Sequence, residues 1–594
     1  MFIWNQEDLN AEQISAIEEE KSVFLIACPG SGKTRTLTYK IARELSKISD
    51  EKKWVVAITY THRAADEIHE RIENLGVDTS KLWIGTIHSF CLEWILKPYG
   101  IYHNVLRHGF RVINSYDTEE LITELCKAYQ GSTITHYDCG YHYTSMGCVL
   151  RCSETKKPHV KHILDQYHNT LFLNKQIDFE QILFYAYELI IQLPIISKLL
   201  SALFSYILVD EYQDTKEVQY KIFSSILNHG KGNVKAFIVG DPNQAIYGSL
   251  GGYAITPKEI REMANIEIVE KALSLNYRSS SRIINYFSNY NAHNTLIEAA
   301  SSLSNFNSHI TFNQMIHKNN LLEELTQLIQ YHIKIVGISP NEICIIAPQW
   351  LHLASMTRSL VVALPEYSFD GPGMVPFARD VDNFWFKLAK IILTEASPKM
   401  YVRRLRWASE ILLALENADV NISHLSAKIL LRECNSIYLD EQNGLKYLEQ
   451  FFFLLFEQLG IDFRIYPTLY EHHQTFFASS RARIDYLKKE QSDFSDIGAF
   501  RKVFQSRSGI TISTIHGVKG AEYDVVIAYA LLEGMVPNFN DNSVESAKKL
   551  LYVIGSRARK YLHLFSEKGR KSGGQYPKEY QPTNILKNCL FNYN

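Results

Sequence analysis

Short apolar runs that end in small or polar residues recur along the chain. They lie at Val23–Ala27, 54–59, 82–90, 206–210 and 236–240. Apolar runs of about 4–8 residues bounded by turn signals are typical of strands buried on both faces. The pattern predicts parallel α/β sheets, in which ligands bind at the carboxyl ends of the strands.

Helical spacing of apolar residues dominates two long segments between such runs. One segment is 96–199, and the other is 396–506. The second contains F-F-F-L-L-F at 451–456, which we expect to be buried, and a further buried strand is expected at 342–348. Both long segments are predicted to be mostly helical insertions into the sheet-forming parts of the chain.

The stretch after the first apolar run carries candidate phosphate chemistry. It matches the pattern A-x-x-x-x-G-K-T from Ala27 to Thr34, with a helix expected to open at Lys33. Glycines let the backbone N–H groups point at the β-phosphate, and the helix dipole adds to the attraction. Lys33 is expected to reach the β- and γ-phosphates, and the Thr34 hydroxyl to ligate Mg²⁺. The predicted nucleotide contacts are Pro29, Gly30, Ser31, Gly32, Lys33, Thr34 and Arg35.

Other strand ends offer groups that complete such a site. Asp210 is placed to hold Mg²⁺, and Glu211 to orient and deprotonate the attacking water. Gln244 is expected to sense the γ-phosphate. Upstream of the loop, behind a predicted helix N-cap at Asn10, the Gln13 amide offers a paired donor and acceptor that suits an adenine edge.

Hydroxyl, imidazole and aromatic side chains gather at the expected carboxyl ends of these strands. Such side chains form the tracks that hold single-stranded nucleic acid. The same residues are also ordinary polar strand ends, and the residues alone leave that alternative open. The candidate DNA contacts are Thr59, Tyr60, His62, Thr86, His88 and Tyr247.

Composition narrows the class of protein. The 594 residues carry a net charge of −2, which excludes a globally basic nucleic-acid binder but not a local basic groove. No stretch approaches the roughly 18 apolar residues of a membrane span, so no membrane association is expected. The nine cysteines lack framework spacing and the N-terminus lacks a signal-peptide pattern, so we expect a cytoplasmic protein.

Cysteine and histidine residues cluster in the segment 136–152. These side chains could bind zinc, but their spacing matches no common structural zinc site. Thiols packed beside aromatic rings are the favoured interpretation. The residues concerned are His136, Cys139, His142, Cys148 and Cys152.

Several motifs together resemble the UvrD/Rep/PcrA type of superfamily 1 DNA helicase. The phosphate loop, D-E-Y-Q-D at 210–214 and G-D-P-N-Q at 240–244 follow one another in that family's order. L-S-L-N-Y-R-S-S-S-R-I-I at 273–284, T-I-S-T-I-H-G-V-K-G-A-E-Y-D-V-V at 511–526 and L-L-Y-V-I-G-S-R-A-R-K at 550–560 resemble its fourth, fifth and sixth motifs.

The resemblance implies roles for residues of these later motifs. In the nucleotide site it implies that Tyr277 stacks on adenine, Arg278 touches the γ-phosphate and Glu522 faces the sugar. Arg557 is the implied arginine finger. The implied DNA contacts are Thr514 and His516.

The family's fold is α/β, with two RecA-like P-loop cores that are each interrupted by a mostly helical inserted subdomain. ATP then binds at the seam between the cores, because Arg278 and Arg557 belong to the second core. The implied domains are a first core at 1–95 and 200–270, its insertion at 96–199, a second core at 271–395 and 507–594, and its insertion at 396–506.

The function that the resemblance implies is an ATP- and Mg²⁺-dependent, DNA-stimulated helicase that moves 3′ to 5′ on single-stranded or tailed DNA. Two alternatives stay open. One is a regulatory subunit whose nucleotide and DNA binding gate a partner nuclease, with little unwinding. The other is a DNA-binding scaffold with a dead ATPase, which the intact Lys33, Glu211 and Arg557 disfavour. The sequence does not separate DNA from RNA.

Three features depart from the pattern of the repair helicases. Pro29 lies where they usually have alanine. G-S-L-G-G at 248–252 lies where they commonly have tryptophan and arginine, so Ser249 disfavours a tight grip on a base. The tail, 568–594, shows no appended partner-binding module, and its composition predicts a flexible tip.

The loop P-G-S-G-K-T, the motif G-D-P-N-Q and the compact second insertion are more similar to UvrD-type helicases of bacterial anti-phage systems. The helicase subunit of Gabija, which works beside an OLD-family nuclease with a Toprim domain, is an example. This likeness implies a role in phage defence rather than in DNA repair, with an OLD/Toprim-type nuclease as partner.

Overall fold

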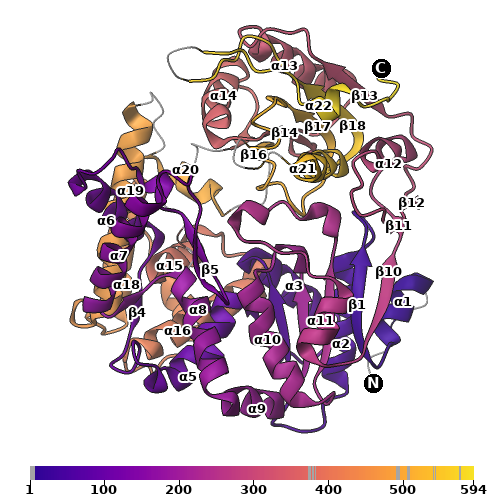
Figure 1. Ribbon diagram of the computed structural model, residues 1–594. Coiled ribbons are helices and arrows are strands. Elements are labelled where there is room, and N and C mark those ends of the chain that lie inside the picture. Colours follow the sequence, from indigo (N-terminus) through magenta and orange to yellow (C-terminus); the bar gives the residue numbers. More distant parts are fainter. Residues whose placement is uncertain are drawn as a thin grey trace.

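Two separate six-stranded sheets form the centre of the molecule, and helical segments lie beside them (Figure 1). Every neighbouring pair of strands in both sheets is parallel, so the predicted α/β class is confirmed. The computed structural model describes residues 4, 7–371, 376–377, 380, 383–489, 495–504, 509–538, 541, 543–573 and 577–594.

The first sheet has the strand order β10-β1-β9-β8-β2-β3. Its four inner strands are buried on both faces, because successive apolar side chains enter different cores, whereas the edge strand β10 is partly exposed. Phe24 packs into one hydrophobic cluster, whereas its neighbours Val23 and Leu25 pack into another. The strands are β1 (Ser22–Ala27), β2 (Trp54–Thr59), β3 (Leu82–Thr86), β8 (Phe204–Asp210), β9 (Lys235–Gly240) and β10 (Ile268–Leu273).

Helices cover both faces of the first sheet. Two of them, α2 (Lys33–Ser46) and α3 (His62–Asn74), pack on the face that carries Val23 and Leu25. The opposite face is covered by α8 (Phe179–Gln192), α9 (Pro194–Leu203), α10 (Glu217–Gly230) and α11 (Pro257–Ala264).

The second sheet has the order β13-β18-β17-β14-β16-β15 and is also covered on both faces. Its strands are β13 (His309–Asn313), β14 (Ile343–Ala347), β15 (Phe369–Asp370), β16 (Ile510–Thr514), β17 (Tyr523–Ala528) and β18 (Ala558–Phe565). The helices α12 (Ser281–Ser288) and α21 (Val544–Ser556) pack on one face, and α13 (Leu321–Gln330) and α14 (Trp350–Ala363) on the other.

The chain between β3 and β8 contains the first predicted insertion. Short strands accompany its helices, since β4 (Arg111–Val112) pairs with β7 (Gln176–Ile177) and β5 (Tyr141–Thr144) pairs with β6 (Gly147–Leu150). The helices that form a separate hydrophobic cluster are α6 (Ser115–Ala128) and α7 (Lys157–Leu173). By contrast, α8 and α9 pack on the first sheet. The predicted domain boundaries stay predictions.

The second helical segment lies beside the first insertion in Figure 1. The expectation that 451–456 is buried is correct for four of the six residues. Phe453 is 56% exposed and Leu454 is half-buried, because the segment is helical and turns these two side chains away from the core. The helices are α15 (Phe384–Leu393), α16 (Tyr401–Asn417), α17 (Ala427–Ser436), α18 (Gly444–Gln458), α19 (Pro467–Lys489) and α20 (Ile497–Lys502).

The prediction of a flexible tip at the end of the tail is wrong. Asn594 exchanges two hydrogen bonds with the backbone of Ile310 on the edge strand β13, and the rings of Phe591 and Tyr593 pack on Tyr286. Aromatic packing and edge-strand pairing outweigh the polar composition of this segment. The short elements are α1 (Ala11–Glu18), α4 (Ile87–Phe90), α5 (Lys97–Tyr99), α22 (Asn584–Lys587), β11 (Leu275–Asn276) and β12 (Glu298–Ala299).

Among the described residues, no single helix is long and apolar enough to cross a membrane. The bent pair formed by α8 and α9 passes such a test on length and composition alone.

Candidate functional site

The glycine loop between β1 and α2 has the geometry that the sequence predicts. Gly30 and Gly32 have positive φ angles of 71° and 77°, and α2 begins at Lys33. A Cβ atom on Gly30 would lie 2.7 Å from the Cβ of Arg278, and one on Gly32 would lie 2.6 Å from the Gln13 amide. Glycine is therefore required at both positions, for its backbone angle and for the close approach of the neighbours.

Two carboxylates lie at the carboxyl end of β8, facing the loop. The Lys33 amino group contacts a carboxylate oxygen of Glu211 and lies 3.4 Å from one of Asp210. Burial by itself raises the pKa of Glu211, but the nearby Lys33 and Lys519 charges outweigh it and lower this pKa to about 2. Burial raises the pKa of Asp210, against the charge of Lys33.

These groups fit a divalent cation. Carboxylate and hydroxyl oxygens are the ligands that Mg²⁺ prefers, and Asp210 and Thr34 supply them at the end of β8 and the start of α2. The ammonium group of Lys33 already lies between the two carboxylates, so this position attracts positive charge. Asp210 and Thr34 are the residues that would hold the ion.

Arg557 reaches this site from the end of α21, in the part of the chain that forms the second sheet. Its guanidinium donates to the Gln244 side chain at 2.9 Å and to the Ala521 carbonyl at 3.2 Å. Only 1% of Arg557 is exposed, and no described carboxylate lies within ion-pair distance of it. Burial, with a smaller effect of the Arg278 charge, lowers the pKa of Arg557 to about 9. A buried cation in such surroundings gains from the arrival of an anion.

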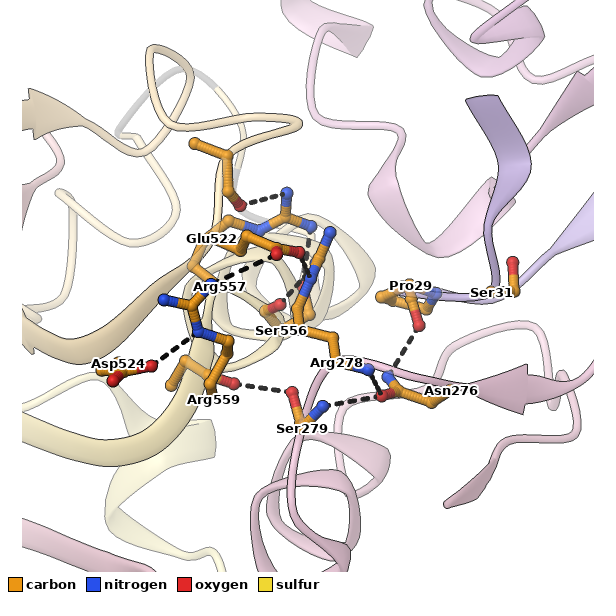
Figure 2. Close-up of polar contacts among 12 residues, drawn as sticks. Pro29, Ser31, Asn276, Arg278, Ser279, Glu522, Asp524, Ser556, Arg557 and Arg559 are labelled. Atoms are coloured by element: carbon orange, nitrogen blue, oxygen red, sulfur yellow. Dashed lines mark hydrogen bonds and ion pairs between the residues drawn. The ribbon is translucent and has the colours of Figure 1, made fainter. Parts of the chain in front are cut away.

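Arg278 lies next to Arg557 and bridges the same two parts of the chain (Figure 2). Its guanidinium donates to Glu522 at 2.5 Å and to the backbone carbonyl of Ser556 at 2.8 Å. Glu522 also accepts from Arg559 at 3.3 Å. The predicted sugar-facing residue is thus held between two arginines.

Asn276 ties this group to the glycine loop. Its side chain donates to the Pro29 carbonyl at 2.6 Å and accepts from the backbone N–H of Arg278 at 2.8 Å. Figure 2 shows these bonds running from the loop to the arginines.

The two predicted adenine contacts, Gln13 and Tyr277, are linked through Asn10 beside the glycine loop. Gln13 caps its own helix by accepting from the Asn10 backbone and donates to the Ser31 carbonyl at 3.0 Å. One N–H and one lone pair of its amide remain for a base. The Tyr277 hydroxyl accepts from the Asn10 side chain at 2.8 Å, and the residue is 45% exposed. Arg35 lies further out, 3.4 Å from Asp8.

The predicted DNA contacts of the first sheet line one cavity of about 1140 Å³. Rings continue from it toward the second sheet: the Tyr60 and Tyr247 centroids are 5.1 Å apart, and the Tyr247 and His516 centroids are also 5.1 Å apart. Burial lowers the pKa of His88 to about 3, so its imidazole is neutral at ordinary pH. The cavity residues among the predictions are Thr59, Tyr60, His62, Thr86, His88 and Tyr247.

Three threonines of the prediction use their hydroxyls within the protein. Thr59 donates to the Thr61 carbonyl at 3.0 Å, and Thr86 accepts from the Ser89 backbone at 3.3 Å. Thr514 accepts from the Gly517 backbone at 3.0 Å and does not line the cavity. These hydroxyls shape the loops that follow the strands.

Lys519 and Asp214 complete the site, and the sequence reasoning missed both. Their side chains form a buried ion pair, and Lys519 also donates to the Gln244 carbonyl at 2.7 Å. The Lys519 amino group lies 5.5 Å from the centroid of the Tyr247 ring. Both residues lie within motifs of the helicase resemblance, Asp214 in 210–214 and Lys519 in 511–526, so these motifs could have pointed to them.

The cysteine and histidine residues of 136–152 do not come together around a point. In the described part of the chain, no group of three or more potential ligands is arranged to hold a metal ion. The Cys139 thiol lies 3.7 Å from that of Cys126, in a hydrophobic cluster with Tyr141 and Tyr167. The His142 ring lies against Gly251.

Comparisons with known proteins place this arrangement in a family. Residues 9–262 match the model of the UvrD/REP helicase N-terminal domain, and residues 495–569 match that of the UvrD-like helicase C-terminal domain. Together the two matches cover more than half of the chain.

Relatives are similar over nearly the whole chain. A Staphylococcus epidermidis protein named ATP-dependent DNA helicase PcrA is 24% identical, over 98% of this chain and 86% of its own length. A probable DNA helicase II homolog of Rickettsia felis is 26% identical, over 95% and 93%. DNA helicase II of Rickettsia typhi is 25% identical, over 95% and 92%.

Proposed function

Because this chain belongs to the UvrD/REP helicase family and is an ATP hydrolase of the DNA helicase type, we propose that it moves 3′ to 5′ along single-stranded DNA. The proposal includes stimulation of ATP hydrolysis by DNA and strand separation on tailed duplexes. The observation that supports ATP hydrolysis between the two sheet-forming parts is the hydrogen bond from Arg557, at the end of α21, to Gln244, in the turn after β9, and the polarity follows from the family resemblance.

The charge at this junction suits phosphoryl transfer. Negative charge on the γ-phosphate must be neutralised, and an arginine supplied from a second structural unit is worth about 10³–10⁵ in rate. Arg557 and Arg278 supply two guanidinium groups beside the glycine loop, and Arg557 is buried without a carboxylate partner among the described residues. Closure of the seam between the two cores would bring both guanidinium groups into contact with the nucleotide.

The remaining roles follow from position. Lys33 binds the β- and γ-phosphates, the backbone of Gly30–Gly32 wraps them, and Glu211 takes a proton from the attacking water. Mg²⁺, when bound, supplies charge neutralisation on the phosphate oxygens. Gln244 senses the γ-phosphate and is hydrogen-bonded to Arg557, so it couples the position of Arg557 to the presence of that phosphate.

The DNA track is the cavity at the ends of β2 and β3 together with the ring series Tyr60, Tyr247 and His516. The ion pair of Lys519 with Asp214 lies beneath Tyr247 and next to Gln244, so it connects track and nucleotide site. Movement of the seam during hydrolysis would therefore displace the rings on which bases stack.

The test is hydrolysis and displacement with defined strands. ATP turnover should rise when a single strand is added, and a duplex with a 3′ tail should be unwound while its blunt counterpart is not. Preference for a 5′ tail would overturn the polarity. Turnover that is indifferent to DNA would overturn the coupling.

The anti-phage role and the OLD/Toprim-type nuclease partner stay predictions. A regulatory subunit that gates such a nuclease would show ATP hydrolysis with DNA but little displacement of a tailed duplex. Measuring both on the same preparation separates the two functions.

A further inference from the structure

A second cavity is lined by the start of α13 and the residues before it, by α14 and by Arg570. Figure 1 shows α13 and α14 side by side on the second sheet, away from the first sheet. The volume of this cavity is about 440 Å³. The side chains that line it include Lys318, Trp350, His352, Arg358 and Arg570, and none of the described lining residues is acidic. We propose that this cavity is a second nucleotide site, which takes a base that bears phosphate groups.

The lining is positively charged. Lys318, Arg358 and Arg570 come from three different segments and meet at the cavity. Arg570 also contacts the buried Glu567, which offsets its charge, whereas Lys318 forms no ion pair among the described residues. Burial, with a smaller effect of the Arg570 charge, lowers the pKa of His352 to about 4, so this imidazole is a neutral hydrogen-bonding group. Such a lining favours phosphate.

The start of α14 adds to the attraction for anions. Trp350 and His352 belong to its first turn, which contains no acidic residue, and the Gln349 side chain makes no capping bond. The backbone N–H groups at the start of a helix lack partners within the helix, and the helix dipole is positive there. Ser355 and Ser359, one and two turns further on, add hydroxyl groups to the lining.

Trp350 supplies the surface for a base. It is 44% exposed although tryptophan is among the most apolar side chains, and it lines the cavity beside the cations. Stacking a base on an aromatic ring is worth about 1–3 kcal/mol. Small-molecule sites span about 300–1,000 Å³, and this cavity lies near the lower end, which favours a free mononucleotide over a longer strand.

The cavity shares no lining residue with the seam described above, so this inference goes beyond the proposed helicase activity. The two sites can be removed separately. Lys33→Ala acts on the seam, and a double variant with Trp350→Ala and Lys318→Ala acts on the cavity. Tyr331→Ala with Lys334→Ala is the matched control, because both residues are exposed and neither lines the cavity.

The experiment is equilibrium dialysis of the full chain against radiolabelled ADP. The wild type should bind a second ADP beyond the one at the seam, and the cavity variant should bind only the seam ADP, which also shows that it is folded. Lys33→Ala should keep the cavity ADP, and the matched control should bind both.

Two results would overturn the proposal. One is binding of a single ADP per wild-type chain, with no ADP bound to the Lys33→Ala variant. The other is that a short oligothymidylate displaces the second ADP from the wild type and no longer binds to the cavity variant. That result would assign the cavity to the DNA strand.

Discussion

At the scale of single residues, Lys33 and Glu211 touch each other but have different tasks. Lys33→Ala removes a charged contact to the phosphates, so ATP affinity should fall by roughly 10- to 150-fold, equivalent to about 1.5–3 kcal/mol. Glu211→Gln keeps Asp210 and Thr34, so ATP should still bind while turnover falls by about 10²–10⁴. Nucleotide titration and steady-state hydrolysis measure the two effects. Undiminished turnover by Glu211→Gln would remove the assignment of the base.

Arg557 allows a second test on one side chain. Arg557→Ala should lower ATP hydrolysis by about 10³–10⁵ and leave single-strand affinity nearly unchanged. The expectation follows from its hydrogen bond to Gln244 and from its burial without a described carboxylate partner. Arg282→Ala is the matched control, since that arginine bonds to the Asn592 carbonyl away from the seam. Normal turnover by Arg557→Ala would exclude this residue from the site.

At the scale of elements, two buried histidines join the turn after α13 to β18. His332 and His563 are hydrogen-bonded through their Nε2 atoms at 2.9 Å, and His563 also contacts Thr311 at 2.8 Å. Burial lowers the pKa of His332 to about 4 and that of His563 to about 3, and the neighbouring His309 adds a smaller effect. In the unfolded chain a histidine has a pKa near 6.5.

This pair makes folding stability depend on pH. Between the folded and unfolded pKa values the unfolded chain binds more protons, so stability is present above about pH 6.5 and is lost as pH falls. Each extra proton contributes a slope of up to about 1.4 kcal/mol per pH unit. His332→Leu should flatten the decline of the unfolding midpoint between pH 7 and 5, whereas the exposed His424→Gln should not. An unchanged slope in His332→Leu would contradict the prediction.

At the scale of the whole molecule, a chain with a net charge of −2 must bind DNA through a local surface. Single-strand binding should therefore weaken steadily as salt rises, with little sequence preference. Salt-independent binding would exclude a phosphate-contacting groove.

Substitution of Ser249 tests whether a base stacks on that DNA-binding surface. Ser249 lies in the exposed turn Gly248–Leu250, directly after Tyr247. Ser249→Trp should strengthen single-strand binding by about 1–3 kcal/mol, roughly 5- to 150-fold, if a base stacks there. Fluorescence anisotropy on one oligonucleotide, with Ser249→Ala as control, measures the change. Equal affinity of both variants would show that no base lies at this position.

Much of this molecule could be predicted from short stretches of sequence. The glycine loop, the N-cap at Asn10 and the strand ending at Asp210 form as expected, because their hydrogen bonds and backbone angles involve residues close in the chain. The same holds for the parallel α/β class, since doubly buried strands produce continuous apolar runs. Roles for Arg278 and Arg557 came from a resemblance, because nothing local in their segments points to a phosphate.

Only the tertiary structure decided which distant groups meet. Arg557 and Gln244 are 313 residues apart, and the buried pair of Lys519 and Asp214 is 305 apart, so no local pattern predicts either contact. Asn594 docks on β13 for the same reason, since an edge strand and an aromatic cluster far away in sequence supply its partners. Sequence patterns record which side chains avoid water, whereas the pairing of buried charges depends on how the loops and helix ends of the two sheet-forming parts meet.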